Sequence, residues 1–164
     1  MKEVAILLLF ALLLNGCGSS TPTVQSTAGG TWEAQLLGGS GDVTAPSFVT
    51  VFTVNSNNSL NISSFEFLTH NNTSCFPING GTVSGQVVLT INTNDTVSGP
   101  FTFTVQSNGN TLTLDGTVTG TAVVGSNNSA TLTGATMTGS WGVTGGTGCN
   151  DTGGSFTMSQ TTTT

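Results

Sequence analysis

The chain has 164 residues, enough for one domain with its own core, and it carries a single Lys or Arg against seven Asp and Glu, a formal net charge of −6. That one cation is Lys2, so nucleic-acid binding and phosphate sites built on Lys or Arg are close to excluded. Thr, Val, Phe and Gly dominate the rest of the chain, which is typical of a folded β protein and not of a disordered one.

The N-terminus has the pattern of an export signal. A charged start is followed by the apolar stretch 4–14, which is too short to span a bilayer because that takes roughly 20 apolar residues. The next residues, Leu-Asn-Gly-Cys at 14–17, resemble the lipobox of bacterial lipoproteins. The resemblance implies that residues 1–16 are removed as a signal peptide and that Cys17 becomes the lipidated first residue. An ordinary secretory signal that leaves Cys17 as a free thiol is the alternative.

Lipidation would fix the protein to a membrane through its acyl chains, of palmitate type. No Asp follows Cys17, and in the sorting rule of Gram-negative lipoproteins this absence favours the outer membrane. Residues 17–29 are mostly Ser, Thr and Gly and predict a flexible tether with a reach of roughly 20 Å. The expected organisation is therefore signal peptide 1–16, lipidated tether 17–29, β domain 30–160 and disordered tail 161–164.

Eight segments are predicted to be β-strands, because β-branched and aromatic residues dominate them and no helical periodicity is present. They are 30–37, 47–55, 59–68, 82–92, 99–107, 111–124, 130–143 and 154–160. Asn, Gly and Asp, which tolerate positive φ, separate most of them and predict turns. Glycines within 111–124 and 130–143 indicate bulges or bends.

The clearest alternation is Phe-Thr-Phe-Thr-Val at 101–105, continued by Leu-Thr-Leu at 112–114 across an Asn-Gly turn. Apolar side chains point to one face and threonines to the other, as a sheet with one buried face requires. We expect an all-β domain: an antiparallel meander of about eight strands, forming an up-and-down barrel or a barrel-like sandwich.

Once Cys17 is lipidated, Cys75 and Cys149 remain. In an oxidising cell envelope two such thiols are expected to form a disulfide. A two-cysteine metal or redox site is the alternative, although no CxxC spacing is present and the chain has one histidine.

The first strand, Gly-Thr-Trp-Glu-Ala-Gln-Leu at 30–36, resembles the opening strand of lipocalins and, more closely, of avidin-type barrels. Both families are eight-stranded barrels in which this tryptophan plugs one end, and some members bind small ligands in the mouth. The resemblance implies that Trp32 is a core plug or, together with Trp141, lines a ligand site. Biotin binding is not implied, because the aromatic cage of avidins has no counterpart in a chain with two Trp and no Tyr.

Catalytic candidates are few. His70 lies in a polar loop, and the carboxylates Glu33, Glu66 and Asp115 lie on predicted strands with no pattern that pairs them. Two Asn/Asp clusters, at 92–95 and 150–151, offer oxygen ligands for calcium but do not follow the twelve-residue calcium loop and are typical of turns. We therefore expect no enzyme activity, no metal and no cofactor.

These observations favour a lipid-anchored, non-catalytic binding module of the cell envelope, held at the outer membrane through Cys17. The ligand would be a small apolar molecule beside Trp32 and Trp141, or a neutral glycan on the Thr- and Asn-rich face. A purely structural coat lipoprotein, and a small hydrolase that uses Glu33, Glu66 or Asp115, are the alternatives.

Overall fold

The computed structural model describes residues 29–39, 45–69, 75–76, 81–92, 94–124, 130–146 and 148–161. Cys17 and most of the tether, Asp42 and His70 lie outside these ranges, as do residues 1–16 and 162–164. Within the described ranges, no helix is long and apolar enough to cross a membrane. The described chain is all-β, and the predicted fold class is confirmed.

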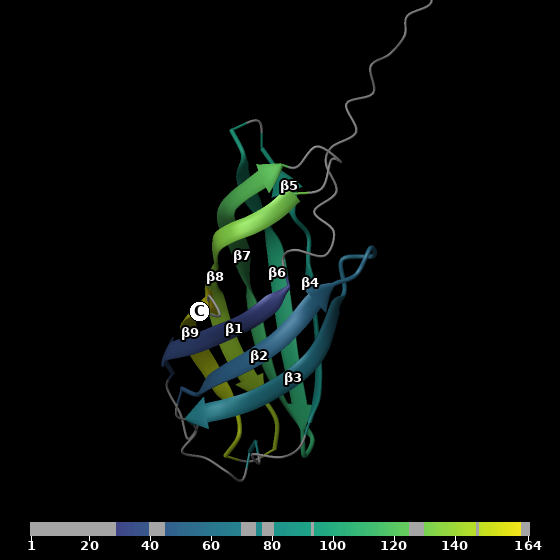
Figure 1. Cartoon of the computed structure of the whole chain (residues 1–164). Helices are drawn as coiled ribbons and strands as arrows, with labels where there is room; N and C mark the ends of the chain where they lie inside the picture. The colour runs from purple at the N-terminus through teal and green to yellow at the C-terminus, as the bar shows by residue number, and fades with distance from the viewer. Residues whose placement is uncertain are drawn as a thin grey trace, which may run out of the picture.

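In the described part of the chain, nine strands build the domain (Figure 1). They are β1 Gly30–Gly38, β2 Ser47–Val54, β3 Leu60–Thr69, β4 Thr82–Val87, β5 Thr90–Ile91, β6 Thr96–Ser107, β7 Asn110–Val124, β8 Ala130–Thr144 and β9 Asp151–Thr161. They form one antiparallel sheet in the order β3-β2-β1-β9-β8-β7-β6-β4, with β5 paired to β6. Because the first strand pairs with the last, the meander curls into a barrel-like shape, with β1–β3 facing β6–β8 across the interior in Figure 1.

The two edge strands, β3 and β4, nearly close the barrel. Where β3 begins and β4 ends, Ser59 and Gln86 form an isolated antiparallel bridge, and the N–H of Val87 donates to the carbonyl of Asn58 at 3.0 Å. The barrel is therefore continuous around β1 and β9, and its seam lies between β3 and β4.

Aromatic rings fill the interior. Phe48 of β2 stacks on Phe103 of β6 with ring centroids 5.3 Å apart, and Phe101 of β6 meets Phe156 of β9 at 6.0 Å. These pairs join strands that are not neighbours in the sheet, so the rings span the interior. Between Phe101 and Phe156, the cross-strand row runs through Gly116 and Gly139. A side chain at either glycine would collide with the backbone of the facing strand, so β7 and β8 pack closely at this point.

The predicted bulges are confirmed where glycines interrupt the long strands. The register of β7 and β8 shifts between Thr119 and Thr121, and Gly134 on the facing strand has φ +59°. A second shift separates Trp141 and Val143 in the pairing of β8 with β9, opposite the positive-φ Gly153. The shifts bend the sheet, as closure requires.

One predicted strand is interrupted. Residues 82–92 form β4 and β5 instead of a single strand, because Val88 and Leu89 face Gly99 and Pro100 of β6, where the ladder breaks. Pro100 has no N–H to donate, and its carbonyl accepts from Val88 N–H at 3.0 Å. A side chain at Gly99 would collide with the carbonyl oxygen of Val88. Close contact and a missing donor therefore stop the pairing here.

The predicted disulfide is confirmed: Cys75 and Cys149 are bonded, with Cα atoms 5.6 Å apart. It joins Cys75, in the connection between β3 and β4, to Cys149, in the connection between β8 and β9. The bond closes a loop across a sequence separation of 74 residues, which restricts the unfolded chain.

Candidate functional site

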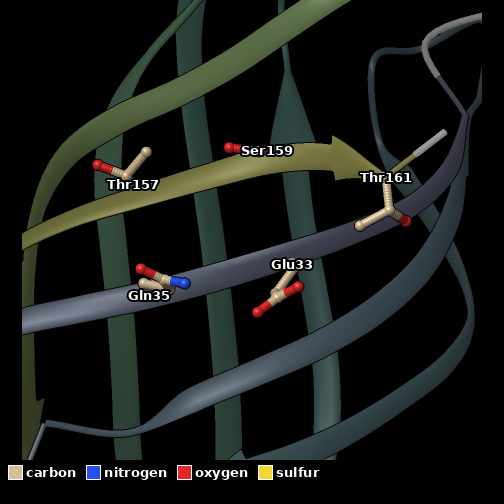
Figure 2. A pocket seen from close by; sticks show the side chains of 5 residues that line it. All are labelled: Glu33, Gln35, Thr157, Ser159 and Thr161. Carbon is tan, nitrogen blue, oxygen red and sulfur yellow. The ribbon is translucent and has the colours of Figure 1, made fainter.

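A shallow hollow lies on the outer surface of the first and last strands, β1 and β9, which pair with each other. It has a volume of about 160 Å³ and is lined by Glu33 and Gln35 of β1 and by Thr157, Ser159 and Thr161 of β9. Figure 2 shows these side chains on one face of the paired strands. The hollow thus combines a carboxylate, an amide and three hydroxyls, a set able both to donate and to accept hydrogen bonds.

Strand alternation explains why these five side chains lie together. Trp32, Ala34 and Leu36 of β1 point into the core, so Glu33 and Gln35 point outward. The antiparallel register then places Glu33 opposite Ser159 and Gln35 opposite Thr157. Thr161 is further fixed by a hydrogen bond from its hydroxyl to the carbonyl of Thr31 at 3.1 Å.

The hydroxyl surface continues beyond the hollow across neighbouring strands. From Ser159 the cross-strand row passes to Thr136 of β8 and Thr119 of β7, whose hydroxyl oxygens lie 3.3 Å apart. From Thr157 a second row passes to Thr138 and Thr117. The outer face of β7, β8, β9 and β1 therefore presents parallel rows of hydroxyls that end at Glu33 and Gln35.

The dimensions of the hollow limit its ligands. Sites that enclose a small molecule have volumes of roughly 300–1,000 Å³, so a hollow of about 160 Å³ accommodates one part of a larger molecule. A second hollow, of about 360 Å³, lies at the turn between β6 and β7 and is formed by residues 106–111. Its Asn110 already uses its amide, which donates to Cys75 O at 2.9 Å and accepts from Gly146 N at 3.1 Å. The β1–β9 hollow, which continues into the hydroxyl rows of β8 and β7, is the better candidate.

Both tryptophans are buried. Trp32 is 0 % exposed and stacks on Phe52 with centroids 5.5 Å apart, whereas Trp141 is 2 % exposed and donates from its indole N–H to Leu37 O at 3.1 Å. Neither lines the two hollows described above. Within the described chain, the indole N–H of Trp32 is a buried donor without a hydrogen-bond partner.

The carboxylates proposed for hydrolysis are partly aligned. Glu33 and Glu66 lie on the same outer face in one cross-strand row, with Val49 of β2 between them. Two strand spacings separate their Cα atoms by about 10 Å. Asp115 lies on β7, opposite Thr102 and Ser140, away from β1. Glu33 is the one carboxylate that lines the β1–β9 hollow.

The Asn-rich turn at 92–95 uses its side chains internally. Asn94 Oδ1 accepts from the Thr96 hydroxyl at 2.6 Å, and Asn92 Nδ2 donates to the same hydroxyl at 3.0 Å. Across the ranges that the structure describes, no three His, Cys, Asp or Glu residues are grouped so that they could hold a metal ion.

The sequence singled out Glu33 but missed Gln35, Thr157, Ser159 and Thr161. Alternation alone assigns each of them to the outer face. Their proximity depends on the pairing of β1 with β9, which would follow from assuming a closed barrel in which the first and last strands are neighbours.

Comparison with known proteins gives no match to a family model, to a curated protein or to a solved structure.

Proposed function

We propose that the protein is an exported lipoprotein, anchored at the outer membrane through a lipid on Cys17, whose barrel binds neutral glycans on its outer face without catalysis. The observation that carries the glycan assignment is the β1–β9 hollow, in which carboxylate, amide and hydroxyl groups meet at the end of two hydroxyl rows. Sugar hydroxyls can pair with each of these groups.

Charge supports a neutral glycan over a charged one. After removal of residues 1–16 the chain retains six carboxylates and no Lys or Arg, namely Glu33, Asp42, Glu66, Asp95, Asp115 and Asp151. Acidic polymers would be repelled by this surface. A neutral polysaccharide meets no such repulsion and offers the hydroxyl groups that the outer face can bind.

The filled interior favours a glycan over a small apolar ligand as long as the Cys75–Cys149 disulfide is intact. An apolar ligand would need space beside Trp32 or Trp141, yet both are at most 2 % exposed and rings from opposite strands touch each other in the core. The same filled interior is the observation that favours the second candidate, a coat lipoprotein without a ligand. Binding experiments separate the two.

The anchor is compatible with the fold. Gly30 begins β1 and Thr161 ends β9, and Thr31 pairs with Thr161, so both ends of the domain leave from the same end of the barrel. The tether would therefore attach at one end and leave the outer face free. Intact mass spectrometry of protein from its own host tests the anchor: a first residue other than a diacylated Cys17 would refute it.

Glycan binding is tested by co-sedimentation with insoluble neutral polysaccharides, such as cellulose and mannan, with an acidic polymer as a negative control. The isosteric variant Thr157→Val removes a hydroxyl from the hollow, and Gln35→Ala removes its amide. Each is expected to weaken binding severalfold. Thr102→Val, also exposed on the outer face but on β6, is the matched control and should bind as the parent does. Failure of the parent to bind any neutral polymer would favour the coat lipoprotein.

A further inference from the structure

The disulfide holds a buried segment across one end of the barrel. Cys75 and Phe76 are 0 % and 3 % exposed although they belong to the connection between β3 and β4 and not to a strand. They lie at the end where β3 and β6 finish and β7 begins, because Phe76 contacts Phe67 near the end of β3 and Cys75 contacts Asn110, the first residue of β7. We call Cys75–Phe76 the end plug.

Within the described ranges, three interactions fix the end plug. Cys75 is bonded to Cys149, its carbonyl oxygen accepts from Asn110 Nδ2 at 2.9 Å, and the ring of Phe76 packs on Phe67 with centroids 6.0 Å apart. The disulfide is the covalent one of the three. The other two are a single hydrogen bond and a ring contact, which compete with water and with chain entropy once the bond is cut.

Behind the end plug lies an apolar surface. Phe67 continues into a chain of rings through Phe48 and Phe103, with centroid separations of 6.3 and 5.3 Å. Close to the same strand ends, Leu112 pairs with Val105 on one side and with Val143 on the other, and each of these residues is at most 2 % exposed. Removal of Phe76 would therefore expose a recess lined by hydrocarbon and shaped around a phenyl ring.

The two cysteine residues differ in exposure. Cys75 is fully buried, whereas Cys149 is 8 % exposed and follows a segment that includes the exposed Gly146. A dithiol would thus attack Cys149 Sγ, forming a mixed disulfide and releasing Cys75 as a thiolate that takes up a proton. The second thiol of the reductant then resolves the mixed disulfide. Cys75 and Cys149 end as thiols, and the dithiol is oxidised to a disulfide.

We propose that the Cys75–Cys149 bond is a redox-sensitive latch on the end plug, and that its reduction by a dithiol of the cell envelope opens an apolar site for a neutral, ring-sized ligand. The present occupant, the Phe76 ring, defines the size and chemistry of that ligand. This site is inside the barrel and is independent of glycan binding on the outer face.

Hydrogen exchange followed by mass spectrometry tests the proposal on the full lipidated protein, oxidised or reduced with dithiothreitol. Reduction is expected to accelerate exchange at least tenfold in the later half of β3 and around the β6–β7 turn, and to leave the far ends of β7 and β8 unchanged. Indole, a neutral aromatic probe, should slow the exchange of the same segments in the reduced protein and have no effect on the oxidised one.

Two variants make the test specific. Phe76→Ala retains the disulfide but lacks the ring, so indole should protect the end segments without reduction. The double variant Cys75→Ala/Cys149→Ala should behave as the reduced protein does and should not respond to dithiothreitol. Unchanged exchange after reduction, a uniform increase over the whole domain, or absence of indole protection in the reduced protein would each overturn the proposal.

Discussion

Replacing Gly139 by Ala should be among the most damaging single-methyl additions to this fold. A Cβ at this position would collide with the carbonyl oxygen of Asp115 and lie 2.5 Å from the Cα of Gly116. Carbon atoms normally approach to about 3.5–4.0 Å, so β7 and β8 would have to separate by about 1 Å at a point where paired residues on both sides hold their register. Overpacking costs typically about 1–3 kcal/mol, and backbone atoms on a paired strand cannot rotate away, so we expect about 3 kcal/mol.

The assay is thermal and urea unfolding with the disulfide intact. A loss of this size lowers the melting temperature by about 10 °C in a domain of this length. Gly146→Ala is the matched control, because its Cβ would meet no atom within 4 Å and the residue is exposed. The control should remain within about 0.5 kcal/mol of the parent. Equal stability of the two variants would refute the argument that the Gly116–Gly139 contact leaves no room for a side chain.

Three further predictions concern the core and its polar contacts. Phe103→Ala should cost about 3–5 kcal/mol in urea unfolding, because Phe103 is fully buried among other rings; a loss below 1 kcal/mol would mean that the interior is loosely packed. Asn110→Ala should cost about 1–3 kcal/mol, since it leaves the carbonyl and the N–H that its amide bonds without a partner, and stability equal to the parent would contradict this role. Trp141→Phe should cost about 1 kcal/mol more than Trp32→Phe, because Trp141 alone of the two donates a hydrogen bond, to Leu37 O; the reverse order would indicate that Trp32 has a partner in solution.

Most of the sheet could be predicted because apolar and polar residues alternate along the strands with the period of two that a β-strand requires. The alternation at 101–105 and 112–114 and the Asn-Gly between them give β6, β7 and their turn, where Asn108 and Gly109 both have positive φ. The pairing of Cys75 with Cys149 followed from their being the two cysteines left in the body of the chain. The hairpin depends on residues close in sequence, and the disulfide follows once Cys17 is set aside, so neither prediction needed three-dimensional information.

Features that depend on distant contacts could not be predicted. The break between β4 and β5 arises from Pro100 and Gly99 on another strand, and nothing within 82–92 signals it. The hollow was not predicted either, because it depends on the pairing of β1 with β9, which follows only once a closed barrel is assumed. The burial of Phe76 was also missed, because a lone Phe in a polar loop gives no sign that a disulfide and Asn110 hold it in the barrel.

The division between inner and outer faces has a consequence for how function can vary in this fold. Each strand supplies the core with one set of residues and the surface with the next, so Phe156 packs on Phe101 while its neighbour Thr157 lines the hollow. Because Lys2 is the one Lys or Arg in the chain, ion pairs with these residues cannot stabilise the β domain, and its stability depends on the inner set, the backbone ladder and the disulfide. The outer set is then free to change without loss of the fold, because a hydroxyl on an exposed strand contributes little to stability. A barrel filled with rings is therefore a suitable scaffold for a binding surface on its outside, where specificity depends on residues that the core does not need.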